Sequence, residues 1–171
     1  MEELEFEITV PTRYTYYFND EINMESVQGL IDVLVNYSAV DLFFTTYGGE
    51  GSTMRILIHF INNHPDIKIY LINHIMSAGT FFLIGCDKEV ILHDELEIIL
   101  FHMGDREVEG QFRKRKINSD ILYEQLKFQN EEMGKKFEKL GLTKKEMKMY
   151  NDGDDVILYK KDFHRLKINK N

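Results

Sequence analysis

The sequence predicts an α/β protein built from repeated β-α-β units, with a mostly parallel sheet covered by helices. Short apolar segments rich in β-branched and aromatic residues alternate with segments whose apolar residues recur at helical spacing. Glycine, proline and asparagine mark the boundaries between these segments. No repeat, linker or low-complexity stretch divides the 171 residues, so a single domain over residues 1–171 is expected.

The first half of the chain carries two of these units. Its clearest helix has apolar residues at positions 27, 30, 31, 34 and 35, which is the spacing of one helix face. Two glycines precede the second helix, and His64-Pro65-Asp66 ends it. The expected elements are a strand at 13–18, a helix at 23–36, a strand at 40–46 and a helix at 52–63.

The second half continues the alternation and then turns helical. The expected elements are a strand at 67–72, a buried helix at 78–84, short strands at 90–92 and 98–101, a long helix at about 119–140 and a strand at 156–159. Gly141 suits the end of the long helix, and Thr143 with Glu146 forms the capping box of another short helix. The apolar stripe of the long helix can pack on its own sheet or on a neighbouring subunit, and periodicity leaves both open.

Composition excludes several function classes. A net charge of −8 argues against nucleic-acid binding, which needs a basic face, and the basic run at 113–116 is expected to be a solvated helix start. The apolar window at 67–85 is interrupted by Lys68, Asn73 and His74, so no membrane segment is expected. The acidic N-terminus lacks a signal-peptide pattern, and the one cysteine, Cys86, suits a reducing compartment. We therefore expect a cytoplasmic protein.

Three short segments carry chemistry. Ser77 lies among small residues where a buried strand meets a helix, Gly48-Gly49 forms a turn before another helix, and His102 ends an apolar strand. A serine hydroxyl is a poor nucleophile unless a base and oxyanion donors activate it. A serine at this place is more often a simple N-cap, and the hydrolase elbow G-x-S-x-G is absent because Ile75 stands at its first glycine position.

Taken together, Gly48-Gly49, Met76-Ser77-Ala78-Gly79 and Phe101-His102 resemble the proteolytic subunits of the Clp protease (the ClpP family). Ser77 and His102 lie 25 residues apart, the interval between nucleophile and base in that family. The resemblance implies a ClpP/crotonase-like fold with Ser77 as nucleophile and His102 as base. It implies an oxyanion hole made by the N–H groups of Gly48 and Ala78.

The third catalytic member is less clear from the resemblance. The family's aspartate falls by spacing on Asn151, and Asp152 is one residue further along. A carboxylate stabilises the imidazolium that forms during catalysis, whereas an amide can only orient the ring. Asp152 is therefore the preferred third member and Asn151 the alternative. The acidic run around them can also be a solvated turn.

The resemblance extends to assembly. Residues 104–111 followed by the long helix resemble the protruding strand-helix handle of the family, at about 104–140, which pairs two heptameric rings into a tetradecamer. The implied partners are a peptide or unfolded-protein substrate, further copies of this chain in such rings, and an AAA+ unfoldase. No metal or organic cofactor is implied.

The expected function is thus a ClpP-like serine endopeptidase acting inside an oligomeric chamber. One alternative is a catalytically inactive ClpP-like ring subunit, motivated by the changed neighbours of Ser77 and the uncertain aspartate. Another is a crotonase-type acyl-CoA enzyme, which shares the sheet and the oxyanion glycines but gives His102 no role.

Overall fold

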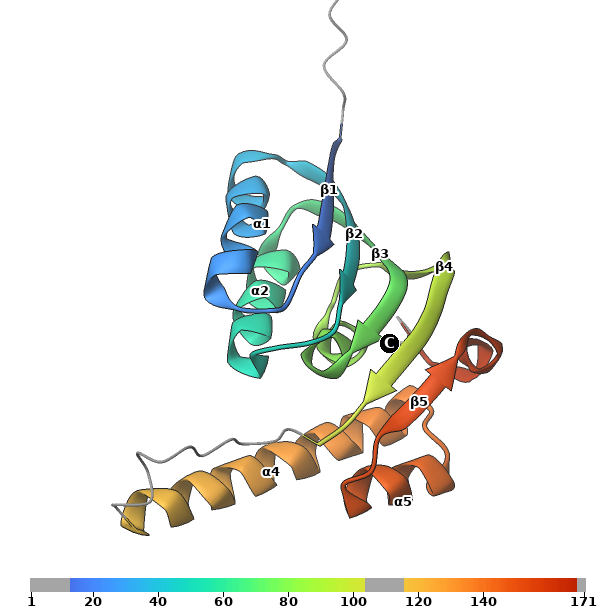
Figure 1. Cartoon of the computed structure of the whole chain (residues 1–171). Helices are drawn as coiled ribbons and strands as arrows, with labels where there is room; N and C mark the ends of the chain where they lie inside the picture. The colour runs from blue at the N-terminus through green and yellow to red at the C-terminus, as the bar shows by residue number, and fades with distance from the viewer. Residues whose placement is uncertain (1–12, 104–115, 169–171) are drawn as a thin grey trace, which may run out of the picture.

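The computed structural model describes residues 13–103 and 116–168, with the side chains of 116–127 excluded. The segment 104–111, expected to be the handle strand, lies outside the described residues. The described part contains one five-stranded sheet in the order β1-β2-β3-β4-β5 (Figure 1). Its strands are β1 (Tyr14–Asn19), β2 (Ala39–Thr46), β3 (Asp66–Met76), β4 (Val90–Phe101) and β5 (Val156–Tyr159).

The first four strands are parallel, as the β-α-β alternation predicts, and β5 is antiparallel to β4. The first two crossovers run through α1 (Met24–Asn36) and α2 (Gly51–Asn63). The third runs through the 3₁₀ helix η1 (Ser77–Phe81) and the short helix α3 (Phe82–Gly85). Because β1 to β4 run in the same direction, their carboxyl ends meet at one edge of the sheet, where ligand sites of such sheets lie.

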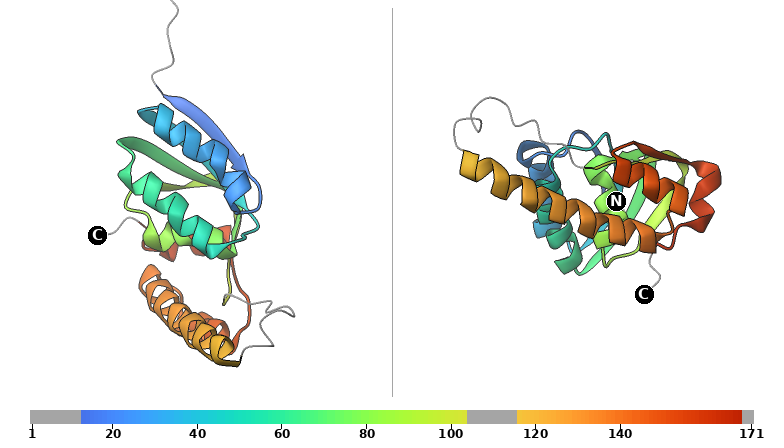
Figure 2. Two further views of the ribbon diagram at one scale, coloured as in Figure 1. Left: turned by 90° about the vertical axis from the view of Figure 1, so that its left-hand side faces the viewer. Right: turned by 90° about the horizontal axis from the view of Figure 1, so that it is seen from below.

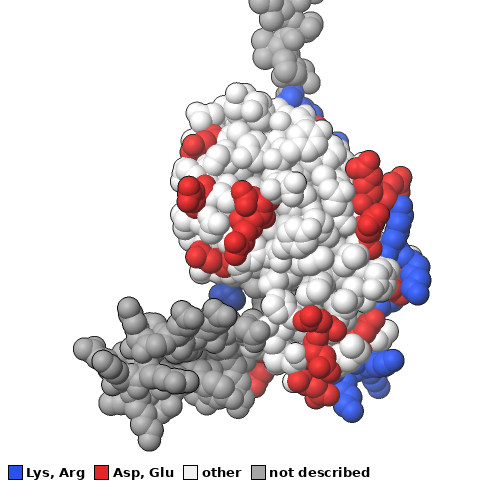
Figure 3. All heavy atoms as spheres, in the orientation of Figure 1, with Lys and Arg blue, Asp and Glu red and all other residues white. Residues whose placement is uncertain are grey.

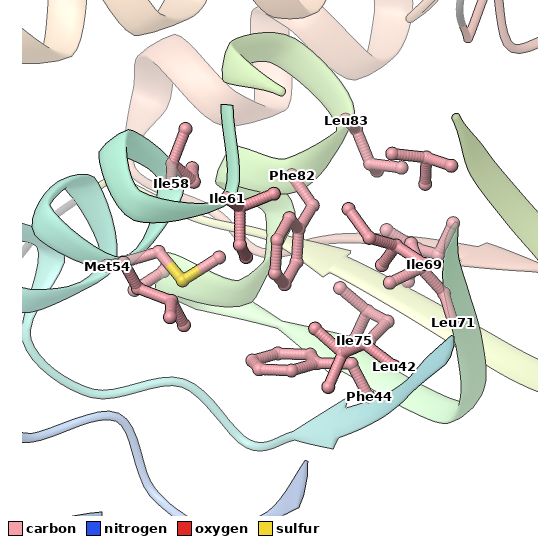
Figure 4. Close-up of a cluster of buried hydrophobic side chains, with 14 of the residues drawn as sticks. Leu42, Phe44, Met54, Ile58, Ile61, Ile69, Leu71, Ile75, Phe82 and Leu83 are labelled. Atoms are coloured by element: carbon pink, nitrogen blue, oxygen red, sulfur yellow. The ribbon is translucent and has the colours of Figure 1, made fainter. Parts of the chain in front are cut away.

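Helices α1 and α2 lie side by side on one face of the sheet (Figures 1 and 2). The core forms between this face and the helices, where Phe44 of β2 meets Phe82 of α3 edge to face at a centroid distance of 4.7 Å. Burying such a side chain stabilises the fold by about 1.5–3 kcal/mol. Figure 4 shows this layer, with labelled residues Leu42, Phe44, Met54, Ile58, Ile61, Ile69, Leu71, Ile75, Phe82 and Leu83.

The strands around the third crossover differ from the expectation. The strand expected at 67–72 continues to Met76, and the two strands expected at 90–92 and 98–101 form one strand, β4. The polar residues between them are accommodated because Asp94 and Glu95 point to solvent while Leu96 returns to the core. Register shifts around Asn73, which has φ of 54°, absorb the mismatch between β3 and β4. The helix expected at 78–84 is divided into η1 and α3.

The C-terminal part consists of α4 (Lys116–Leu140), α5 (Lys144–Asp152), β5 and the 3₁₀ helix η3 (Lys160–Arg165). The predicted capping box is confirmed, since Thr143 and Glu146 bond each other's backbone N–H. Phe137 and Leu140 of α4 are buried in the chain's own core, so the described end of this helix packs on its own domain. None of the described helices is both long and apolar enough to span a membrane.

Candidate active site

Ser77 lies at the sharp turn where β3 ends and η1 begins. It is half-buried and has φ of 51°, in the left-handed region that residues other than glycine seldom adopt. The Thr80 hydroxyl donates a 2.7 Å hydrogen bond to the Ser77 carbonyl and closes the turn. The N-cap of η1 is Met76, so Ser77 is its first residue and not its cap. An unusual backbone conformation held by its surroundings is a common feature of functional sites.

Gly48 and Gly49 lie directly against this turn. Their φ angles are 114° and 133°, so both positions favour glycine. A Cβ on Gly48 would lie 2.5 Å from the Cβ of Ser77, and a Cβ on Gly49 would lie 2.3 Å from the Ile22 carbonyl oxygen. The backbone of Gly48 therefore touches Ser77 only because the side chain is missing.

The two glycines differ in what their N–H groups do. Gly48 N–H donates to Thr46 Oγ1 at 3.0 Å, and that hydroxyl donates in turn to the Asp20 carbonyl at 2.8 Å. The Gly48 N–H is thus bonded to a side chain of its own turn. The bridge beside Ile22 uses the Gly48 carbonyl and the Glu50 N–H, which leaves the Gly49 N–H pointing away from Ile22. Gly49 lines the cavity described below.

Tyr47, which directly precedes the two glycines, packs on a residue of the neighbouring strand β3. Its ring lies on the imidazole of His74 at a centroid distance of 4.0 Å. Burial lowers the pKa of His74, and its Nε2 has no hydrogen-bond partner among the described residues. A neutral imidazole therefore supports the residue that precedes Gly48.

A cavity of about 510 Å³ brings the predicted residues together. Its walls come from Gly49 and the first turns of α2, from η1, from His102 after β4, and from α4 and α5. Ser77, Ala78 and His102 all line it. The full lining consists of Gly49, Gly51, Ser52, Arg55, Ser77, Ala78, Thr80, Phe81, His102, Gln129, Asn130, Met133, Phe137 and Tyr150.

His102 reaches the cavity because β4 ends one residue earlier. Phe101, the last residue of β4, is fully buried and packs edge to face on Phe137 at 4.8 Å. This contact fixes where the chain leaves the sheet, and His102 is half-buried at that point. Because β3 and β4 are neighbouring parallel strands, Ser77 and His102 follow the same edge of the sheet.

The candidates for the third member lie at the end of α5. Asn151 and Asp152 are exposed and do not line the cavity, whereas Tyr150, the residue before them, is buried and does. Burial raises the pKa of Tyr150 to about 12, so its phenol stays neutral. Asn151 Oδ1 lies near α4, 3.8 Å from where a Cβ on Gly134 would be. Successive helical residues are rotated by about 100°, so Asp152 lies further than Asn151 from the direction of Tyr150.

The tertiary structure adds residues to the site that the sequence did not single out. They include Arg55, Phe81 and Tyr150. Arg55 was detectable as the only cation in the helix after the glycine turn. The others carry no local signal, because an apolar residue in a helix usually belongs to the core.

Among the described residues, no group of three or more His, Cys, Asp or Glu side chains could hold a metal ion. The described lining of the cavity offers the hydroxyls of Ser52, Ser77 and Thr80, the His102 imidazole, two side-chain amides, backbone N–H donors, a phenol and a guanidinium. A hydroxyl and an imidazole at one edge of a parallel sheet can act as nucleophile and base.

No protein-family model matches the chain, and no curated protein matches it. Among solved structures, a mutant of ClpP1 from Listeria monocytogenes is similar, with a TM-score of 0.59 and 16% sequence identity. The similarity covers 89% of this chain and 88% of that one. At 16% identity, the two proteins share the path of the backbone. The chain therefore has a ClpP-like α/β fold.

Proposed function

We propose that this chain is a ClpP-like serine endopeptidase with Ser77 as nucleophile and His102 as base. The observation that carries the proposal is that both residues line one cavity from the ends of neighbouring parallel strands, with Ser77 held in a left-handed turn against Gly48. The sequence interval between them and the ClpP-like fold point the same way.

The proposed reaction needs only groups of this chain. His102 takes the proton from Ser77 Oγ as the oxygen attacks the carbonyl carbon of the peptide, and then donates it to the leaving amine. Water then hydrolyses the acyl-enzyme, with His102 again acting as base. We assign the oxyanion donors to the N–H groups of Ala78 and Gly49, because Gly49 lines the cavity and the Gly48 N–H is bonded to Thr46.

For the third member we favour Asn151 over Asp152. The side chain of Asn151 is turned toward α4, whose residues Met133 and Phe137 form one cavity wall. Its amide oxygen is the group that would accept a hydrogen bond from the imidazole and orient it. Asp152 stays the alternative, because a carboxylate would stabilise the imidazolium better.

The proposal includes assembly into rings that enclose the substrate. The sheet face opposite α1 and α2 carries a row of stacked rings, Tyr17, Phe43 and Tyr70, with centroids 4.9 and 4.7 Å apart. Tyr17 is 68% exposed. A row of aromatic rings on a sheet face, with one ring exposed and two partly exposed, is suited to contact with another protein surface. Further copies of this chain are the proposed occupants, and heptameric rings that can stack follow from the resemblance, as does an AAA+ unfoldase as a partner.

Labelling with a fluorophosphonate probe tests the proposed nucleophile. We expect one adduct, located on Ser77 by peptide mass spectrometry, together with hydrolysis of an internally quenched peptide. Ser77→Ala should abolish both while leaving the circular dichroism spectrum and the oligomer size unchanged. Ser52→Ala is the matched control, because Ser52 also lines the cavity but lies within helix α2 and does not directly follow a strand.

Two results would contradict the proposal. Labelling at another residue, or unchanged hydrolysis by Ser77→Ala, would remove Ser77 from the mechanism. A ring-forming protein that neither labels nor cleaves would be the inactive subunit. Binding of an acyl-CoA without labelling would indicate the crotonase-type activity.

A further inference from the structure

The cavity beside Ser77 contains a single Lys or Arg side chain, Arg55, and no Asp or Glu among its described lining residues. Arg55 lies in the second turn of α2, whose first residues Gly51 and Ser52 line the same cavity. The whole chain carries a net charge of −8, so an unopposed cation at this place contrasts with the rest of the protein.

The guanidinium of Arg55 is positioned by an aromatic ring. Its Cζ lies 5.7 Å from the centre of the Phe81 ring, within the range of a cation–π contact. Phe81 belongs to η1, the helix that begins at Ser77, and its ring also abuts the start of α2. Because Phe81 and Ser77 belong to one short helix, this contact ties the position of Arg55 to that of the nucleophile.

The donors of Arg55 remain available to a ligand. No ion pair or hydrogen bond within the described part of the chain involves its guanidinium. A guanidinium has five N–H donors in a planar fork that matches the two oxygens of a carboxylate. The contact with the Phe81 ring uses no N–H donor in a hydrogen bond to another described residue.

We propose that Arg55 determines specificity by binding a carboxylate of the peptide substrate inside the cavity. The proposal rests on the peptidase function proposed above and names its substrate class as acidic peptides. Met133 and Phe137 supply an apolar wall against which the methylene groups of a glutamate can pack. The carboxylate can belong to an Asp or Glu side chain near the scissile bond or to a free C-terminus.

The test uses internally quenched, C-terminally amidated peptides that differ only in one central residue, Glu, Gln or Lys. The wild-type protein is expected to prefer Glu over Gln in kcat/KM on the order of 10- to 100-fold, the usual weight of a charge-assisted hydrogen bond. The preference should disappear as the pH falls below about 4.3, where the glutamate of the peptide takes up a proton.

Variants of Arg55 test whether this residue causes the preference for the Glu peptide. Arg55→Gln should bring the Glu to Gln ratio close to one, Arg55→Lys should keep part of it, and Arg55→Glu should favour the Lys peptide. Lys148→Glu is the matched control, because Lys148 is exposed on α5 and does not line the cavity. It should retain the wild-type ratio.

The outcomes separate this inference from the proposed function. Cleavage at Ser77 with equal rates for the Glu and Gln peptides, and also for the amidated and free-acid forms of the Gln peptide, overturns the role of Arg55 and leaves the peptidase intact. If no peptide is cleaved, fluorescence anisotropy of labelled peptides on Ser77→Ala protein decides, and equal affinity for Glu and Gln peptides again overturns it. Faster cleavage of the free-acid form of the Gln peptide than of its amide, lost in Arg55→Gln and without a preference for Glu over Gln, assigns the carboxylate to the chain end instead of a side chain.

Discussion

At the residue scale, the candidate site depends on two adjoining backbone positions with positive φ. Ser77 at 51° and Gly48 at 114° lie in contact, and neither conformation is easy for an ordinary residue. A non-glycine residue in such a region costs of order 1–3 kcal/mol, which the surrounding hydrogen bonds and packing must offset. At Ser77 the Thr80 hydroxyl and the buried end of β3 provide that support.

The identity of the third catalytic member also depends on single residues. If Asn151 orients His102, Asn151→Ala should lower turnover by about 100-fold, because a misplaced base loses its alignment with the hydroxyl. Asp152→Asn should leave turnover close to wild type. Asn151→Asp should keep activity and move the acid limb of the kcat/KM profile to higher pH, since a carboxylate favours the protonated imidazole.

Steady-state kinetics between pH 5 and 9 on the three variants provide the measurement. A large loss in Asp152→Asn together with an active Asn151→Ala would instead assign the role to Asp152. Thermal unfolding of each variant is the control, because both residues belong to the last turn of α5.

At the element scale, α5 is fixed to the rest of the domain by one carboxylate. Glu146 accepts hydrogen bonds from Thr143 N–H at 2.7 Å and from the Arg165 guanidinium at 2.9 Å. Arg165 also donates to the Gly141 carbonyl, so η3, α5 and the end of α4 meet at this group. Tyr150 and Asn151 owe their place beside the cavity to the helix that this network holds.

This network predicts a pH dependence of stability. Burial alone would raise the pKa of Glu146, but the hydrogen bonds from Thr143 and Arg165 outweigh it and lower the pKa below the ordinary 4.5. The contribution of the carboxylate is therefore complete above about pH 4.5 and is lost as the pH falls through the lowered value. Glu146→Gln should reduce the free energy of unfolding by about 1 kcal/mol at pH 7 and by progressively less at acid pH.

Urea denaturation at pH 3, 4, 5 and 7 measures the difference between wild type and Glu146→Gln. Glu132→Gln is the control, because its ion pair with Lys135 is exposed and screened by solvent. A Glu146→Gln deficit that stays constant with pH would show that packing, and not charge, is responsible.

At the scale of the whole molecule, charged groups and aromatic groups occupy different areas. On the face shown in Figure 3, acidic residues gather over α1, and both signs gather around β4, β5 and α5. A broad area with few charges lies between them, over β1 to β3. Tyr17, Phe43 and Tyr70 belong to these three strands.

The proposed rings are expected to use this area. The wild-type protein should form a homo-oligomer at micromolar concentration in mass photometry. Tyr17→Glu should shift it toward monomers, because it places a charge in an apolar contact. Val35→Glu is the matched control, since Val35 is also 68% exposed but lies on α1. A monomeric wild-type protein, or equal effects of the two variants, would contradict this use of the sheet face.

Features that depend on near neighbours in the chain could be predicted from the sequence alone. The α1 helix, its end at Asn36, the capping box of Thr143 and the parallel order of β1 to β4 follow from periodicity and turn residues. These signals are local, because a helix turn or a cap involves residues three or four positions apart. The placement of Ser77 and His102 was also predictable, since each directly follows an apolar strand.

Features that depend on packing between distant segments became visible in the folded structure alone. It joined two expected strands into β4, placed β5 antiparallel, and bonded the Gly48 N–H to Thr46 so that Gly49 lines the cavity. It also placed Arg55 on Phe81 and turned Tyr150 inward while leaving Asp152 exposed. Each of these features depends on which distant surfaces come into contact. The pattern of apolar and polar residues along the chain does not specify such contacts.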